Sequence, residues 1–539
     1  MDRRSFLLGA GGAGMLAAAG AAGYRRWQEI TPDIRKPGRA EGHFLRDLHD
    51  RHALPPPSAQ IDTDIVILGS GIAGLTAAWK LQKEGKRDFL VIDGPEAYGN
   101  AASASLDGYA CPTGAHYLPL PSTDAFHVRE ILHDLGILLR NPAAAKPYYD
   151  ERFLLHEPQE RILFQDRWQE GVLPKEGVPA WELEEQQRFH AEMERIHALR
   201  GAEGRRLFIL PSALSSHDPA WRALDGISFR TWLEQNRFRA PTLHWYADYC
   251  CRDDYGAGYD KVSAWAGLHY FCSRGGQAEN AADGAWLTWP GGLAPLATGL
   301  DRAAGARRRT GTAVSLEKTA RGVQALCVEL KNGRPHSYLI RARKAICAMP
   351  LFVAARVVQN MSSYGFDPAR HLPSYAPWLV ANFLVKGFPQ ELPQAPLSWD
   401  NVVYGGKGLG YVVSTHQDVR VTPPQKTVLT AYIDLSAQEP QAARRWLQDA
   451  HPQDLLALAM SDLTAAYGKR FAGQVERADL TLRAHAMATP RPGFLANAGL
   501  QALRAADGAI LFAHADLSGF SLFEEASWWG YQAALRALA

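Results

Sequence analysis

Three glycines at a fixed spacing, followed by an acidic residue, are the residues of this 539-residue chain best suited to bind a ligand. Residues 69–74 read Gly-Ser-Gly-Ile-Ala-Gly, and Asp93 follows about 20 residues later, where an acid would accept hydrogen bonds from a ribose. The glycines suit a tight turn, close approach of the backbone to a pyrophosphate, and close helix–strand packing. We therefore expect a dinucleotide to contact Gly69, Ser70, Gly71, Ile72, Ala73, Gly74 and Asp93.

The elements around these residues fit that chemistry. Residues 64–68 read Asp-Ile-Val-Ile-Leu, an apolar run typical of a buried parallel strand, and 75–81 has helical spacing. The free N–H groups at the start of that helix would face the phosphates. A second strand, 89–92, ends at Asp93. The alternative is a glycine-rich turn without chemical meaning, and the order strand, turn, helix, strand argues against it.

Length and composition limit the classes of protein to which this chain can belong. A chain of 539 residues exceeds one ordinary core, so we expect two or more domains. The 58 basic and 56 acidic residues leave a net charge of +2, which gives no indication of a nucleic-acid partner or a polyanionic substrate. Six cysteines include no Cys-x-x-Cys pair and no zinc-like Cys/His spacing, so we expect no metal site.

The first thirty residues are typical of a targeting segment. Arg3 and Arg4 precede Phe6 and Leu7, and a Gly/Ala-rich stretch runs on to Gly23. The pattern resembles a bacterial twin-arginine export signal and is short for a membrane span. We predict the twin-arginine export machinery as a partner and a periplasmic location, with a membrane anchor if the signal stays uncleaved; the alternative is a plain apolar start. Residues 31–60 are predicted to be a leader.

Four later motifs occur in a recognisable order. They are Gly-Ala-His-Tyr at 114–117, Trp-Pro-Gly-Gly at 289–292, Ile-Cys-Ala-Met-Pro at 346–350, and Ile-Leu-Phe-Ala-His-Ala-Asp at 510–516. With the first glycine turn, they resemble the flavin-containing amine oxidase superfamily, which includes protoporphyrinogen oxidases and phytoene desaturases. The resemblance covers nearly the whole mature chain.

That resemblance implies FAD as the cofactor and an α/β fold. A FAD/NAD(P)-binding Rossmann-like domain would be built from residues 61–125, 286–355 and 476–539. A discontinuous α+β substrate domain would be built from residues 126–285 and 356–475.

The resemblance also carries site residues. Gly99 and Asn100 stand near the phosphates, Gly114, Ala115 and His116 would approach the isoalloxazine, and the backbone of Val314 would contact the adenine. Pro350 ends a strand at the site, Asp516 would contact the ribityl or pyrophosphate, and the backbone at Leu522, Phe523 and Glu524 would face the flavin pyrimidine. His116 is the catalytic candidate, able to orient substrate or move a proton; the alternative is a histidine hydrogen-bonded within a loop.

The chain departs from the family at several positions. No arginine follows the ribose acid, the strand 379–385 lacks the family's lysine until Lys386, and Leu522 replaces a cage tyrosine. We expect an exported FAD-dependent oxidoreductase that moves a hydride from a small organic molecule, an amine or an unsaturated or apolar compound, to flavin N5, with oxygen or another electron acceptor. Alternatives are a desaturase or dehydrogenase of a larger apolar substrate, or a non-catalytic flavin-holding accessory protein.

Overall fold

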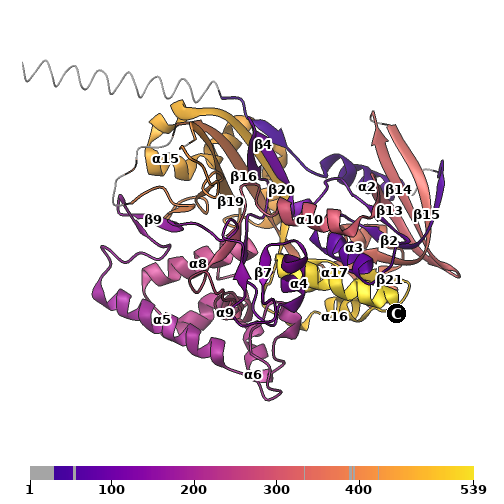
Figure 1. Cartoon of the computed structure of the whole chain (residues 1–539), viewed down its shortest axis with the longest axis horizontal. Helices are drawn as coiled ribbons and strands as arrows, with labels where there is room; N and C mark the ends of the chain where they lie inside the picture. Colours follow the sequence, from indigo (N-terminus) through magenta and orange to yellow (C-terminus); the bar gives the residue numbers. More distant parts are fainter. Residues whose placement is uncertain (1–29, 52–55, 333, 388–390, 392–394, 423) are drawn as a thin grey trace, which may run out of the picture.

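The computed structural model describes residues 30–51, 56–332, 334–387, 391, 395–422 and 424–539. Two large sheets lie side by side in Figure 1, with helices around each. Residues 1–29, and with them the expected export signal, lie outside the described residues. Among the residues described, no helix is long and apolar enough to cross a membrane.

The first sheet contains the predicted dinucleotide-binding strands. Its order is β12-β3-β2-β15-β14-β13, with β21 beside β15, and β3, β2, β15 and β21 run parallel. The apolar run Ile65–Leu68 is fully buried within it, as expected for a parallel strand covered on both faces. The strands are β2 (Gln60–Leu68), β3 (Phe89–Ile92), β12 (Arg307–Arg309), β13 (Thr312–Thr319), β14 (Gly322–Lys331), β15 (Arg334–Cys347) and β21 (Ile510–Phe512).

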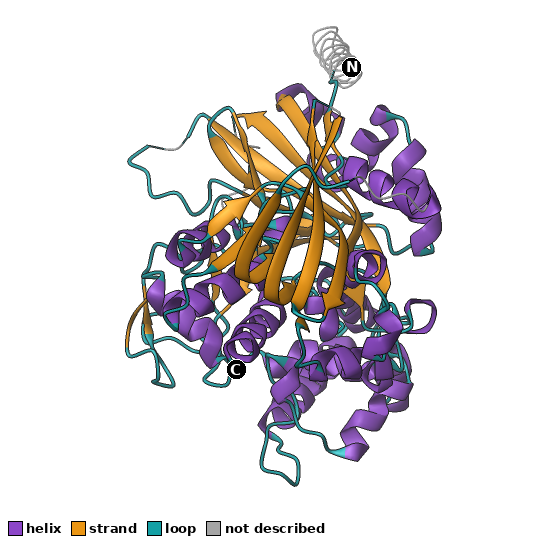
Figure 2. Cartoon of the chain, turned by 90° about the vertical axis from the view of Figure 1, so that its right-hand side faces the viewer, coloured by secondary structure: helices purple, strands orange, loops and turns teal. Residues whose placement is uncertain are grey.

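Helices pack around this sheet, and Figure 2 shows helices beside and below the strands. Helix α3 packs against both α10 and α17. Gly530 of α17 allows close contact, because a Cβ there would lie 2.1 Å from the carbonyl oxygen of Ala73. The helices of this half are α2 (Arg39–Arg51), α3 (Ile72–Lys83), α4 (Phe126–Asp134), α10 (Ala294–Ala304), α11 (Leu351–Val357), α12 (Pro368–His371), α16 (Ala498–Ala505) and α17 (Phe523–Leu538).

The second sheet has the order β1-β20-β16-β19-β18-β17-β9-β10 and is mostly antiparallel. Its central strand β16 is buried from Tyr375 to Val385. Its strands are β1 (Asp33–Arg35), β9 (Glu160–Phe164), β10 (Arg167–Glu170), β16 (Ser374–Lys386), β17 (Asp400–Val403), β18 (Tyr411–Val413), β19 (Lys426–Asp434) and β20 (Val475–Thr489).

Two segments differ from the division expected from the sequence. The segment 476–539, assigned to the dinucleotide domain, begins inside β20, which pairs with β16 of the second sheet; the chain returns to the first sheet at β21. The predicted leader 31–60 contains strand β1 and helix α2. Both differences arise from pairing between residues far apart in the sequence, which local patterns do not record.

Further helices cover the second sheet, and small ribbons join the two halves. Residues 180–273 form a helical layer with its own apolar core, built around Phe189, Phe229 and Trp265. The helices are α5 (Ala180–Ala198), α6 (Pro219–Arg222), α7 (Phe229–Gln235), α8 (Pro241–Tyr255), α9 (Ala264–Ser273), α13 (Pro440–Asp449), α14 (Pro452–Ala459) and α15 (Ser461–Tyr467). The two-stranded ribbons are β4 (Ser103–Leu106) with β5 (Tyr109–Pro112), β6 (Tyr117–Pro119) with β11 (Trp286–Thr288), and β7 (Leu138–Arg140) with β8 (Tyr148–Tyr149).

Candidate active site

A cavity of about 940 Å³ lies between the two sheets, near the upper end of the range for small-molecule sites. Its walls come from the β2–α3 turn, the ends of β3 and β15, the start of α17, and α13 and β20 of the second half. Most of the predicted cofactor residues line it: Gly69, Ser70, Gly71, Ile72, Ala73, Asp93, Gly99, Asn100, Ala115, Pro350, Asp516, Leu522 and Phe523.

The three glycines of the first turn have different surroundings. Gly69 has φ +113°, and a Cβ there would lie 2.7 Å from the carbonyl oxygen of Ala348. At Gly74 a Cβ would lie 1.9 Å from the carbonyl oxygen of Gly69, whereas at Gly71 it would meet no protein atom within 4 Å. Gly71 is also the residue before the first turn of α3 and has no side-chain cap. The free N–H groups of α3 therefore begin at an open wall of the cavity, which suits a phosphate.

This difference predicts the outcome of substitution at Gly71. Its φ of −71° and ψ of 179° suit any residue, so Gly71→Leu should fold, while its side chain would enter the cavity. We expect a Tm within about 2 °C of the unsubstituted protein, since surface-like changes stay within about 0.5 kcal/mol. Affinity for FAD should fall at least about a hundredfold, which is about 2.7 kcal/mol.

The matched control is Gly508→Leu, because Gly508 also faces open space but does not line the cavity. Isothermal titration of the apoprotein with FAD measures both variants. Equal affinity in Gly71→Leu and Gly508→Leu would show that the turn does not face the dinucleotide.

Asp93, the acid expected to bind the ribose, already forms an ion pair through one of its carboxylate oxygens. Both Arg308 contacts, from Nε at 2.8 Å and from Nη2 at 2.5 Å, reach Oδ1 of Asp93. Arg308 also pairs with Asp301. The hydroxyl and N–H of Ser70 donate to the backbone carbonyl of Asp93, at 2.9 and 3.4 Å. Arg308 thus fixes the carboxylate at the end of β3, at the wall of the cavity.

Asp516 lies at the other end of the site and is buried. Its carboxylate accepts hydrogen bonds from the N–H of Leu351 at 2.9 Å and from the hydroxyl of Tyr375 at 2.7 Å. The pKa of Asp516 is lowered despite its burial, because His514 and these donors favour the charged form. The fixed carboxylate is suited to accept hydrogen bonds from hydroxyl groups of a ligand.

Five predicted residues are absent from the cavity wall: Gly74, Gly114, His116, Val314 and Glu524. The two glycines serve packing, since a Cβ at Gly114 would lie 2.2 Å from the carbonyl oxygen of Asn100. Val314 is buried at a bulge of β13, while its neighbours Thr312 and Ala313 line the cavity. Glu524 is buried in the first turn of α17, and burial raises its pKa to about 7.

His116 belongs to an aromatic cluster next to the cavity. Its ring stacks on Tyr432 with centroids 4.4 Å apart, and Tyr117 and Trp399 lie at 4.9 and 5.5 Å. Burial lowers the pKa of His116 to about 3, so the imidazole is neutral at pH 7. Proton transfer by His116 near neutral pH is therefore disfavoured, whereas an orienting role stays a prediction.

The same cluster is continuous with the cavity and includes Trp286, Trp378 and Trp399. Ala486 and Met487 pack against the cluster and also line the cavity. Tyr432 donates a hydrogen bond of 3.1 Å to the carbonyl oxygen of Gly114. The aromatic cluster therefore lies next to the segment 114–116, of which Ala115 lines the cavity.

Carboxylates that the sequence did not single out lie among these rings. The Tyr117 hydroxyl lies 3.2 Å from Asp253 and 3.4 Å from Asp254. Burial and the neighbouring Asp254 raise the pKa of Asp253 to about 7. Asp400 lies opposite Glu160 in the β17–β9 ladder, and burial followed by the charges of Glu160 and Asp253 raises its pKa.

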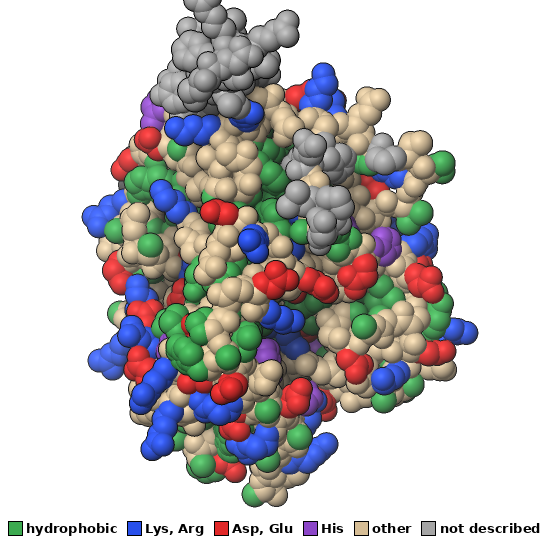
Figure 3. Space-filling view, turned by 90° about the vertical axis from the view of Figure 1, so that its left-hand side faces the viewer, with side chains coloured by type: hydrophobic (Ala, Val, Ile, Leu, Met, Phe, Trp, Pro, Cys, Tyr) green, Lys and Arg blue, Asp and Glu red, His purple; other side chains and the backbone are tan. Residues whose placement is uncertain are grey.

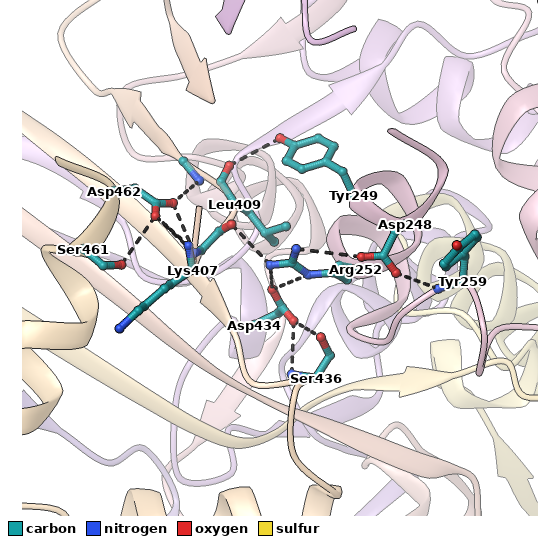
Figure 4. Close-up of polar contacts among 12 residues, drawn as sticks. Asp248, Tyr249, Arg252, Tyr259, Lys407, Leu409, Asp434, Ser436, Ser461 and Asp462 are labelled. Atoms are coloured by element: carbon teal, nitrogen blue, oxygen red, sulfur yellow. Dashed lines mark hydrogen bonds and ion pairs between the residues drawn. The ribbon is translucent and has the colours of Figure 1, made fainter. Parts of the chain in front are cut away.

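A polar network holds helix α8, which carries Asp253, against the second sheet (Figure 4). Arg252 donates to Asp434 at the end of β19, at 2.7 Å, and Asp248 accepts from the N–H of Tyr259 at 3.1 Å. Asp462 accepts from the N–H groups of Lys407, Gly408 and Gly410 and so fixes the loop before β18. Asp253 is thereby held at a fixed place in the aromatic cluster.

The residues present fit FAD. Arg444 and Arg356 line the cavity, and no ion pair among the described residues includes either of them. Burial alone lowers the pKa of Arg444, as expected for a cation without an anion beside it. A ligand with two negative phosphates would supply that charge. The family's strand lysine has no equivalent here, because Lys386 is exposed at the far end of β16.

The fold and cavity together define a two-domain dinucleotide-binding architecture. A family model described as an NAD(P)-binding Rossmann-like domain matches residues 67–135. A solved putrescine oxidase with redesigned cofactor binding matches with a TM-score of 0.64 and 17% identity, over 89% of this chain and 99% of that one.

Two other solved structures match over similar lengths. Cyclohexylamine oxidase from Brevibacterium oxydans IH-35A has a TM-score of 0.61 and 17% identity, covering 88% of this chain and 99% of that one. A conjugated-linoleic-acid (CLA)-producing fatty acid isomerase from P. acnes has a TM-score of 0.57 and 14% identity, covering 88% and 98%. The resemblance to the amine oxidases and the predicted fold class, a Rossmann-like domain with a discontinuous second domain, are confirmed at the level of the fold.

Proposed function

We propose that this protein is a FAD-dependent oxidoreductase that oxidises a cationic organic amine. The observation that carries the proposal is a cavity lined by a glycine turn and two helix starts, with an aromatic, carboxylate-bearing cluster packed against it through Ala486 and Met487. FAD would supply the hydride acceptor when bound. The fold shared with putrescine and cyclohexylamine oxidases supports the proposal.

The chain's own residues have separate tasks in this proposal. The start of α3 would bind phosphate groups, together with Arg356 and Arg444, which form no ion pair with another described residue; Asp93 and Asp516 would accept from hydroxyls. The start of α17, with Leu522 and Phe523 at the wall, would direct its N–H groups at the ring system. The rings of His116, Tyr432 and Trp399 would exclude water and orient the substrate.

The carboxylates favour a cationic amine over an apolar substrate. Asp253, Asp400 and Glu160 all have raised pKa values, mainly through burial. Among the described residues no ion pair involves any of the three, whereas neighbouring Asp254 pairs with Arg274. A cation placed among them would lower their pKa values and gain both charge–charge attraction and contact with aromatic faces.

A spectroscopic experiment tests this function. Purified protein, or apoprotein supplied with FAD, should show a flavin absorbance spectrum, and anaerobic mixing with mono- and diamines should bleach it. Bleaching by an unsaturated fatty acid but by no amine would contradict the amine assignment. A flavin that responds to no compound in a broad panel would support an accessory protein, and colourless protein that cannot be reconstituted would contradict the proposal altogether.

Export by the twin-arginine route is proposed on the sequence alone, from Arg3 and Arg4, Phe6 and Leu7, and the Gly/Ala-rich stretch that runs to Gly23. Charged side chains of both signs are interspersed on the face shown in Figure 3, and the net charge of +2 gives no argument for a nucleic-acid partner. A small-molecule substrate and an electron acceptor are the partners this proposal requires.

A further inference from the structure

Residues 30–48, here called the N-terminal strap, run from the second sheet to the first. Strand β1 pairs in parallel with β20, and Ile30 and Ile34 pack in the core of the second half. Arg35 pairs with the fully buried Asp479 at 2.6 Å. Figure 1 shows this indigo segment crossing from the large sheet toward α2 and the β13–β15 strands.

The other end of the strap is fixed to the dinucleotide-binding half. Leu45 of α2 is 4% exposed in the core of that half, and Phe44 and Leu48 pack against the same core. The chain turns into α2 at Gly38, which has φ +70° and where a Cβ would lie 3.3 Å from Cγ of Pro95. Pro95 follows shortly after Asp93, so the turn lies beside the expected nucleotide end of the cavity.

Between these attachments the strap forms one wall of the cavity. Lys36, Arg39, His43 and Arg46 of the strap all line it, against a single strap acid there, Glu41. Arg46 pairs with the adjacent Asp47, but no ion pair among the described residues includes Lys36 or Arg39. The pKa of Lys36 is lowered, first by burial and then by the charge of Arg39, against a smaller opposite effect of Asp449. Two mutually repelling cations face the cavity, and an anion there would relieve the repulsion.

We propose that Lys36 and Arg39 of the N-terminal strap bind the phosphate groups of FAD, and that the bound cofactor in turn stabilises the strap against local unfolding. The inference rests on the proposed function, since it takes FAD as the ligand. It adds strap cations to Arg356 and Arg444, since residues Tyr98 to Ala101, which follow shortly after Asp93, carry none. Charge-assisted contacts from side chains of this kind are shorter and stronger than neutral ones.

The first test measures FAD affinity in the full-length apoprotein of Lys36→Gln/Arg39→Gln. Flavin fluorescence titration should give a Kd at least tenfold weaker than that of the unsubstituted protein, with a smaller dependence on salt. The control is Arg195→Gln/Arg230→Gln, which removes two half-exposed arginines of α5 and α7 that do not line the cavity. Its Kd should change by less than twofold.

The second test follows the strap itself. Trypsin can cleave after Arg46 in both proteins, and FAD should slow that cleavage at least tenfold in the unsubstituted protein but much less in Lys36→Gln/Arg39→Gln. A Kd unchanged in that double variant, or cleavage indifferent to FAD, would overturn the strap inference and leave the proposed function standing. Failure of the unsubstituted protein to bind FAD would overturn both.

Discussion

Gly74→Val is expected to yield no folded, FAD-binding protein. A Cβ at this position would lie 1.9 Å from the carbonyl oxygen of Gly69 and 3.2 Å from Cβ of Ala348. Both partners belong to the ends of buried strands, so α3 would have to move away from the sheet. Because α3 packs against α10 and α17, the displacement would open the core of this half. Overpacking costs about 1–3 kcal/mol or more, against a total stability of about 5–15 kcal/mol.

Soluble yield and flavin absorbance of the purified protein measure this outcome. We expect soluble yield to fall at least tenfold, with no flavin spectrum in what remains. Gly530→Val tests the same packing from α17, since its Cβ would lie 2.1 Å from the carbonyl oxygen of Ala73. Gly71→Leu, only three residues away, should by contrast fold. A soluble Gly74→Val protein with an unchanged Tm and bound FAD would contradict this account.

The glycine turn was predictable because its determinants are local. A buried strand, a turn and a small-residue helix are adjacent in sequence, and two of the three glycines have a steric reason in the structure, Gly69 through its positive φ and Gly74 through close packing. Local sequence patterns of this kind predict helices and strands, and with them the residues on the dinucleotide-binding side of the cavity.

The sequence did not predict that the N-terminal strap is part of the fold. Strand β1 has only three residues, too few for a periodic pattern, and exists through its pairing with Asp479–Thr481 of β20. In α2 only Phe44, Leu45 and Leu48 form an apolar face among mostly charged and polar residues, and a short helix of this composition is stable mainly through packing. A polar, proline-bounded segment therefore resembles a leader until its partners are known.

The carboxylate cluster was missed for a related reason. Asp253, Asp400 and Glu160 are more than ninety residues apart in the chain, and only the β17–β9 ladder and the position of α8 bring them together. Two adjacent aspartates near the end of a helix, Asp253 and Asp254, do not by themselves indicate a binding site. The neutrality of His116 could not be read from sequence either, because it follows from burial among Tyr117, Trp399 and Tyr432.

Asp253→Asn should lower kcat/KM for a cationic amine about a hundredfold at pH 8 and much less at pH 6. The pKa of Asp253 is raised to about 7, first by burial and then by Asp254. The carboxyl is therefore mostly neutral at pH 6 and charged at pH 8. Pairing of a partly buried carboxylate with a cation contributes about 2–3 kcal/mol, or about a hundredfold. Unsubstituted protein should thus gain kcat/KM as pH rises through 7, and the variant should lose that rise.

The pH profile is obtained by measuring anaerobic flavin reduction from about pH 5.5 to about pH 9, a range that brackets the titration of Asp253. The groups that bear on Asp253 are Tyr117, Asp254, Arg274, Asp400 and Asp434. The matched control is Asp507→Asn, an exposed residue before β21, which should leave the profile unchanged. If the Asp253→Asn protein had the same pH profile as the unsubstituted one, Asp253 would have no part in substrate binding.

Thermal unfolding gives a second, independent measure of the protonation state of the Asp253 carboxyl. Because its pKa is raised in the folded state above 3.8, the folded protein keeps a proton that the unfolded chain releases between about pH 4 and 7. Stability from this group is therefore greatest below pH 4 and is lost as pH rises to 7. Buried His116 and His269, with lowered pKa values, act in the opposite direction, so only the difference between the variant and the unsubstituted protein isolates Asp253. That difference in Tm should shift in favour of Asp253→Asn as pH rises, and a difference independent of pH would mean that Asp253 is charged throughout.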